Sequence, residues 1–189
     1  MTGKTHQVLG MATALSYFVS QSDVKYSPAT MGAVLVAAHL TSVLPDIDQP
    51  AAQIWAELPF GKTIGKISDP ILKHRNITHS AVGFILIGTG LFYLFKLFPD
   101  YWGIDRRVLL IASLIAYCSH LVADMFTQEG IPLFFPYKRM IGIPPKPFDG
   151  IRIMTGKWFE NLVIFPAVNL FFIIFIILNW SKIKMILLR

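Results

Sequence analysis

Long apolar segments separated by shorter polar ones dominate this chain. Five segments have the length and continuous hydrophobicity of helices, and they lie at about 6–20, 28–44, 79–98, 106–127 and 160–183. The pattern predicts an all-α fold: an integral membrane bundle of about five long helices. The last three segments are each close to the roughly 20 residues with which a helix crosses a bilayer. The first two are shorter, so we expect them either to cross the membrane or to pack as core helices against the others.

Polar residues and prolines mark the predicted helix boundaries. Ser27 is a suitable N-cap, and Pro28 after it favours the first helical turn. Asp105 is a second candidate cap. Two long intervening segments, at about 46–78 and 128–159, are rich in proline, glycine and basic residues. Segments of this length in a compact domain are usually functional or disordered, and we expect both to lie on one face of the membrane.

Composition supports the membrane interpretation. Hydrophobic residues make up 54% of the chain and charged residues 15%, with a mean hydropathy of +0.56, whereas a soluble domain has about a quarter of its residues charged. The net charge of +6 is spread between apolar segments, so we expect a lipid bilayer as partner and no nucleic acid. The length fits one domain over residues 1–189. The single cysteine, Cys118, excludes an internal disulfide, and we expect it to be a packing residue.

The ionisable residues gather at one end of the predicted bundle. If the five helices alternate in direction, one face carries His6, Asp46, Asp48, His79, His120, Asp124 and Glu160. The opposite loops and the C-terminal end contain no histidine. Ionisable groups close to hydrocarbon are costly and need partners. A divalent metal shared by several imidazoles and carboxylates is a suitable partner.

His120 and Asp124 are four residues apart, so on a helix they lie one turn apart on the same face. In an extended segment the carboxylates of Asp46 and Asp48 point the same way and can bridge two metals. We therefore predict one to three divalent ions, zinc first and manganese or iron as alternatives. The predicted ligands are His6, Asp46, Asp48, His79, His120 and Asp124.

Several of these residues also have plain structural explanations. Asp46 and Asp48 suit a solvated turn after a helix, and His79 suits a helix cap. Glu160 suits the first turn of a helix, where the helix dipole favours negative charge. His39 lies deeper than the others, and we expect a hydrogen-bonded core histidine or a residue that supports a ligand.

Particular sequence blocks resemble the YdjM-like family, described as LexA-regulated, metal-dependent hydrolases of the inner membrane. The blocks are "KTH", "LPDID", "HRNITHS", "SHLVADMFTQEGIPLFFP" and "TGKWFE". Gln49 departs from the family, since histidine follows "PDID" in many members. The resemblance implies a multi-pass protein of the inner membrane. The family is distantly similar to zinc-dependent phospholipase C and P1-type nucleases, whose His-x3-Asp pair matches His120 and Asp124, and this implies phosphoester hydrolysis.

The predicted function is therefore a membrane-bound hydrolase that cleaves a phosphoester with a metal-activated water. Asp48 is a candidate general base, and Glu160 is a candidate catalytic residue, ligand or support for one. Basic residues of the two long segments are predicted to bind the substrate's phosphate: Lys73, His74, Arg75, Lys138 and Arg139. A site at the ends of spanning helices meets lipid headgroups, so a phospholipid or a polyprenyl phosphate is the expected substrate, with a small phosphate-containing molecule as the alternative.

Three other functions remain open at this stage. An ion- or metal-binding transporter is one, although such sites usually lie at the bilayer midplane. A serine hydrolase using Ser80 or Ser119 is another, but the chain has no "GxSxG" motif. A non-catalytic scaffold stabilised by metal is the third. The basic residues in the shorter segments favour a cytoplasmic C-terminus, with the ionisable cluster facing outward.

Overall fold

The structure is a computed structural model, and it describes residues 1–21, 26–48, 54–55, 77–137 and 139–188. Six α-helices occur in these ranges: α1 (Gly3–Ser20), α2 (Pro28–Thr41), α5 (Ala81–Lys96), α6 (Arg106–Met125), α7 (Phe165–Leu178) and α8 (Trp180–Leu187). The same residues contain two isolated β-bridges and no named strand. The predicted all-α fold is confirmed.

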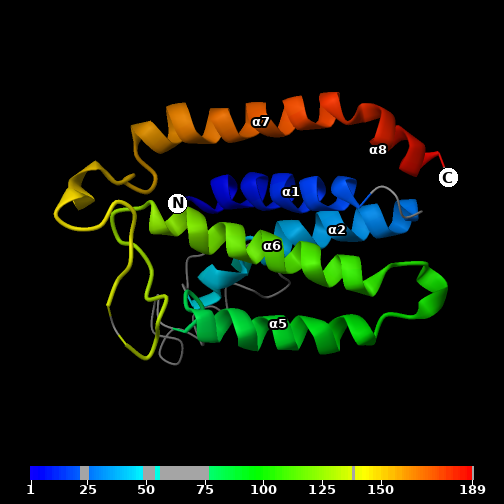
Figure 1. The fold of residues 1–189 in the computed structure, drawn as a ribbon, viewed down its shortest axis with the longest axis horizontal. Helices are drawn as coiled ribbons and strands as arrows, with labels where there is room; N and C mark the ends of the chain where they lie inside the picture. Colours follow the sequence, from blue (N-terminus) through cyan, green and yellow to red (C-terminus); the bar gives the residue numbers. More distant parts are fainter. Residues whose placement is uncertain (22–25, 49–53, 56–76, 138, 189) are drawn as a thin grey trace.

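The long helices run roughly parallel or antiparallel to one another, as Figure 1 shows. α6 packs against α1, α2 and α5, and α7 packs against α1. Small residues permit this close packing, as is usual between helices in membranes: Ala112 and Ala116 of α6 and Ala14 of α1 are fully buried. Gly10 of α1 has the same effect, because a Cβ there would lie 2.4 Å from the Cβ of Ser42.

Three helical segments are long and apolar enough to cross a membrane: Pro28–Asp48, Arg106–Met125 and Glu160–Leu178. The first is longer than predicted, because a 3-10 helix, η1 (Leu44–Asp48), follows α2. α5 is shorter than the predicted 79–98, at 16 residues. No residue of α7 is fully buried, which suits a helix that packs against α1 on one side and faces hydrocarbon on the others.

The predicted caps are confirmed. The Ser27 side chain accepts a hydrogen bond from the Thr30 amide, and the Asp105 side chain accepts one from the Val108 amide. The single helix predicted over 160–183 is wrong. It begins with a π-helical turn, η4 (Glu160–Ile164), and is interrupted at Asn179, whose side chain donates to the carbonyl of Phe175.

Aromatic side chains mark both ends of the bundle. Tyr101 and Trp102, between α5 and α6, are exposed, as is Trp180 at the start of α8. Trp158 and Phe159 are exposed at the other end, just before η4. Belts of tryptophan and tyrosine are typical of the two membrane–water interfaces. Their positions support a bundle whose long axis crosses the bilayer.

The segment between α6 and α7 is folded over its described part. Ile131 and Ile141 exchange two backbone hydrogen bonds, and Ile153 donates to the Phe126 carbonyl and accepts from the Gln128 amide, just after α6. The Arg152 guanidinium donates to the carbonyls of Pro144 and Gly142. These bonds hold the segment against the end of the bundle where α6 ends and α7 begins.

Candidate metal centre

Five ionisable side chains from separate parts of the chain meet at one end of the bundle. His6 comes from α1, Asp46 from η1, His79 from the turn before α5, and His120 and Asp124 from α6. They form two groups, His6–His120–Asp124 and Asp46–His79–His120, and within each group the potential ligand atoms lie within 4.8 Å of one another. Only Asp46 is partly exposed, at 14%. The predicted gathering at one face is confirmed.

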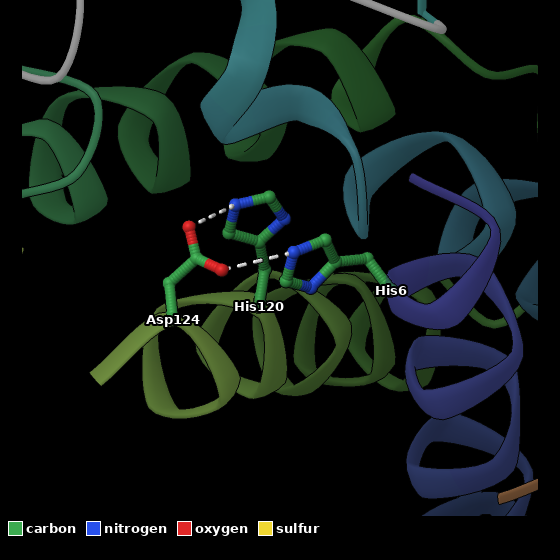
Figure 2. Close-up of side chains that lie close together, drawn as sticks. All are labelled: His6, His120 and Asp124. Carbon is green, nitrogen blue, oxygen red and sulfur yellow. Dashed lines mark ion pairs between the residues drawn. The ribbon is translucent and has the colours of Figure 1, made fainter. Parts of the chain in front are cut away.

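The first group is built around the carboxylate of Asp124, which lies to one side of two imidazole rings and directs one oxygen toward each (Figure 2). One oxygen, Oδ1, lies 3.1 Å from His6 Nε2, and the other, Oδ2, lies 3.7 Å from His120 Nε2. The two rings stack, with centroids 3.6 Å apart. The amino group of Met1 also donates to Oδ1. The spacing of four residues between His120 and Asp124 does place both side chains on one face of α6, as predicted.

The second group has distances suited to a shared cation. His79 Nε2 lies 3.3 Å from His120 Nε2 and 3.5 Å from Asp46 Oδ1. The distance from His120 Nε2 to Asp46 Oδ1 is 3.8 Å. Asp124 Oδ2 lies 3.8 Å from His79 Nε2. A tetrahedral ion with bonds of about 2.0–2.1 Å separates its ligand atoms by about 3.3 Å. The observed separations are equal to that value or slightly longer.

Hydrogen bonds on the far side of each ring fix which nitrogen faces the group. His120 Nδ1 lies 2.7 Å from the carbonyl oxygen of Ser42, which only accepts, so Nδ1 donates and Nε2 carries a lone pair. The Thr78 hydroxyl donates to Asp48 at 2.9 Å, so His79 Nδ1, 3.3 Å from that hydroxyl oxygen, is the donor to it. His79 Nε2 then also carries a lone pair. Two lone pairs beside carboxylates repel one another unless a cation lies between them.

The buried ring nitrogens of His6 also favour a bound cation. Its ring is fully buried, and among the described residues neither ring nitrogen has a hydrogen-bond partner. The 3.1 Å approach of Nε2 to Asp124 is an ion-pair distance that lacks hydrogen-bond geometry. A buried polar group without a partner is unfavourable. A metal bound by the imidazole would satisfy it, so the residues present fit the predicted group.

Asp48 lies on the other side of His79 from Asp46. Its Oδ2 is 3.9 Å from His79 Nδ1, whereas Asp46 faces Nε2. The expectation that the two carboxylates point the same way is wrong, because the segment is a 3-10 helix rather than extended. At three residues per turn, residues i and i+2 point about 120° apart. Asp48 therefore lies on the Nδ1 side of the candidate ligand His79, away from the nitrogen that faces the group.

Glu160 lies outside both groups. Its Oε1 accepts hydrogen bonds from the Thr2 amide, the Thr2 hydroxyl and the Thr5 hydroxyl at 2.6–2.9 Å, and its Oε2 accepts one from the Gly156 amide at 2.7 Å. The carboxylate thus joins η4 to the first turn of α1, directly before His6. Sequence reasoning missed the two threonines, although "MTGKTH" places Thr5 next to the histidine.

Two further residues position His79 and were also missed. The Tyr117 hydroxyl, buried on α6, donates to the Thr78 carbonyl. Gly83 lies where α5 meets the preceding turn, and a Cβ there would lie 2.0 Å from the Ile77 carbonyl oxygen. A glycine four residues after a candidate ligand, in the first turn of a helix, was the available sequence signal.

Other residues considered from the sequence lie apart from the two groups. His39 is hydrogen-bonded to Gln7 at 3.1 Å, as expected of a core or supporting histidine. The hydroxyls of Ser80 and Ser119 donate to backbone carbonyls. Cys118 is exposed, which contradicts the expected packing role. Cys118 lies about 200° around α6 from the buried His120, and therefore on the opposite, exposed face of the helix.

Four of the five predicted phosphate-binding residues, Lys73, His74, Arg75 and Lys138, lie outside the described residues, as does Gln49. The fifth, Arg139, is exposed on the segment between α6 and α7. It lines a cavity of about 840 Å³ together with Lys146 and Tyr137. This part of the protein therefore offers cationic groups beside a hollow, next to the end of α6.

Comparison with known proteins places the chain among bacterial membrane proteins. A family model described as "YdjM inner membrane protein" matches residues 1–186. Inner membrane protein YdjM of Escherichia coli (strain K12) is 32% identical over 148 residues, which cover 76% of this chain and 70% of that protein, and the YdjM protein of Shigella flexneri matches equally. The uncharacterized protein YvsG of Bacillus subtilis (strain 168) is 28% identical over 166 residues, 87% of this chain and 88% of that protein. No solved structure matches.

Proposed function

The chain belongs to the YdjM family of inner membrane proteins, and from this premise we propose that it is a metal-dependent hydrolase that cleaves a phosphoester at the membrane surface. The observation that carries the proposal is the pair of facing nitrogens, His79 Nε2 and His120 Nε2, 3.3 Å apart. Each ring donates on its far side, so two lone pairs and the carboxylates of Asp46 and Asp124 converge on one point.

The residues that would hold metal are those of the two groups: His6, Asp46, His79, His120 and Asp124. A divalent metal such as zinc supplies a Lewis acid that makes water a stronger nucleophile near neutral pH. Asp124 presents one oxygen to each group, which supports more than one ion and agrees with the expected range of one to three.

The chain's own residues prepare this site in distinct ways. The Ser42 carbonyl holds the tautomer of His120, and Thr78 with Asp48 holds that of His79, as outer partners of metal ligands commonly do. We assign Asp48 to this orienting role in place of the general base suggested by sequence. Asp46, the one partly exposed member, marks the side from which substrate reaches the site.

Location supports a lipid substrate. The two groups lie where helices end, and helix ends of a spanning bundle meet the headgroups, whereas transporter sites usually lie near the bilayer midplane at broken helices. The cavity next to α6 is lined by three cationic residues, Arg139, Lys146 and Arg152, against two acidic ones, Glu129 and Asp149, and this excess of positive charge suits a phosphate. A phospholipid or a polyprenyl phosphate is therefore the proposed substrate class.

The test begins with elemental analysis of the detergent-purified protein. We expect at least one equivalent of zinc, manganese or iron, lost in His120→Ala and Asp46→Ala and retained in His39→Ala, whose side chain pairs with Gln7. The metal-loaded protein should then hydrolyse bis(p-nitrophenyl) phosphate or a phospholipid. A wild-type protein that binds no metal after incubation with zinc or manganese would falsify the proposal.

A further inference from the structure

A second cavity, of about 580 Å³, lies between α2 and α5. Both helices pack against α6, and Leu109 of α6, which is buried, forms part of the floor. The α2 side is lined by small residues, including Gly32 and Ala33, and the α5 side by larger ones, including Leu91 and Phe95. The small residues of α2 leave a groove between two helices that share a neighbour.

The groove is apolar, and both of its lips are exposed. Val36 on the α2 lip is 63% exposed, and Leu94 on the α5 lip is 49% exposed. Thr41, a polar lining residue, turns its hydroxyl to the Ala37 carbonyl at 2.8 Å. From Gly32 to Thr41 the groove follows α2 for about 14 Å at 1.5 Å per residue. That is about half of the roughly 30 Å hydrocarbon core, the depth of one leaflet.

One end of the groove reaches the candidate metal centre. Leu44 and Ile47 of η1 line it, and Asp46 lies between them in sequence. Asp46 Oδ1 is 3.5 Å from His79 Nε2, and Asp46 is the partly exposed member of the two groups. A polar site and an apolar groove therefore meet at a single short 3-10 helix.

We propose that this groove holds one hydrocarbon chain of the lipid substrate, with the lipid's phosphoester end at Asp46 and His79. The inference rests on the proposed function and names how the substrate is held. A lipid tail in the bilayer is already in an apolar medium, so the groove gives little hydrophobic gain. Its effect is positioning: a tail held along α2 fixes where the polar end stands relative to the site.

Two glycines offer a matched pair of variants. Gly32 and Gly90 are both exposed helix residues, and a Cβ built at either meets no atom within 4 Å. Gly32 lines the groove, and Gly90 is not among the lining residues. Gly32→Phe is expected to fill the groove without disturbing the fold, and Gly90→Phe adds the same ring elsewhere. Equal thermal unfolding temperatures would confirm that both variants remain folded.

The probe is phosphatidylglycerol with a diazirine midway along one acyl chain, in vesicles of phosphatidylethanolamine and phosphatidylglycerol. After irradiation, adducts are expected at Val36 and Leu94 in the wild type and in Gly90→Phe. In Gly32→Phe they should fall to the level seen on the outer face of α7, for example at Ile174. Adducts spread evenly over all lipid-facing helices, or unchanged in Gly32→Phe, would overturn the groove proposal.

A second readout separates this proposal from the proposed function. Gly32→Phe should lower hydrolysis of phosphatidylglycerol on the order of tenfold, because the bound lipid is misplaced. It should leave metal content and hydrolysis of water-soluble bis(p-nitrophenyl) phosphate unchanged. Equal loss on both substrates would contradict the groove. Groove adducts on a protein that binds no metal would instead overturn the hydrolase and leave the tail site standing.

Discussion

The hydroxyl of Thr78 donates a 2.9 Å hydrogen bond to Asp48, thirty residues earlier in the chain. This bond forces the Thr78 oxygen to act as acceptor toward His79 Nδ1, 3.3 Å away. The result is a relay on the rear side of a candidate ligand, and it determines which imidazole nitrogen faces the metal-binding group. Asp48, two residues after Asp46, therefore acts on the same candidate ligand, His79, from the opposite side of its ring.

Asp48→Asn is expected to weaken metal binding by about 10–100-fold, the usual effect of removing an outer partner of a ligand. The new amide can donate to the Thr78 hydroxyl oxygen, which frees that hydroxyl to donate to His79 Nδ1; the ring proton then moves to Nε2 and blocks ligation. The measurement is a metal titration against a competing chelator. Thr89→Val, which removes an exposed hydroxyl bonded to the Ile85 carbonyl, is the control. Unchanged affinity with lost turnover would instead restore Asp48 as the general base.

His6 can be tested by exchanging one ring for another. His6→Phe keeps an aromatic ring to stack on His120 while removing two buried nitrogens that have no hydrogen-bond partner among the described residues. The change also removes the contact of His6 with Asp124 Oδ1, so we expect lower stability whether or not His6 binds metal, and metal content is the deciding readout. We expect bound metal per protein to fall, as measured by elemental analysis. Full metal content in a folded His6→Phe protein would remove His6 from the ligand set.

Glu160→Gln tests whether the carboxylate acts by chemistry or by position. One amide nitrogen replaces an acceptor, so at least one of the bonds from Thr2, Thr5 or Gly156 is lost. We expect destabilisation of about 1–3 kcal/mol, seen as a lower unfolding temperature in detergent. Hydrolysis per folded, metal-saturated protein should change little. A variant as stable as wild type but inactive would support the catalytic role predicted from sequence.

Gly83→Ala should displace the turn that carries His79. The added Cβ would lie 2.0 Å from the Ile77 carbonyl oxygen, which is backbone and cannot swing away. Crowding of this kind costs about 1–3 kcal/mol, against a gain of about 1 kcal/mol in helix propensity. We expect lower stability and weaker metal binding. Gly90 has open space around it, so Gly90→Ala gains helix propensity without a steric cost. Equal stability and metal affinity in the two variants would refute the steric explanation.

The sequence could predict that the ionisable residues gather at one end of the bundle, because this depends only on successive helices alternating in direction. Helices that reverse direction bring the start of α1, the end of α2, the start of α5 and the end of α6 to one side (Figure 1). Any ionisable residue at those boundaries is then a candidate. Helix type and local turns were not predictable in this way. The 3-10 geometry of η1 separates Asp46 from Asp48, and a break at Asn179 divides the last helix into α7 and α8.

The role of Glu160 shows a second limit of the sequence. Its position at the start of a helix agreed with the alternation, and it does lie at the same end of the bundle. Its hydrogen bonds, however, depend on how the segment after α6 returns to Thr2 and Thr5. Contacts between residues 155 or more positions apart follow from packing of the whole chain, which local pattern does not encode.

The path of the chain predicts that the two termini lie on opposite sides of the membrane. In Figure 1 the N-terminus lies at the end of the bundle where α2 ends and α5 begins, which is the end with the two candidate metal groups, and the C-terminus lies at the other end. The basic residues near the short connections and α8 favour a cytoplasmic C-terminus, so the groups should face outward. Alkaline phosphatase and green fluorescent protein fused to each terminus measure this directly. We expect fluorescence only from the C-terminal fusion and phosphatase activity only from the N-terminal one. The reverse pattern would place the candidate metal centre in the cytoplasm, and both termini on one side would contradict an odd number of crossings.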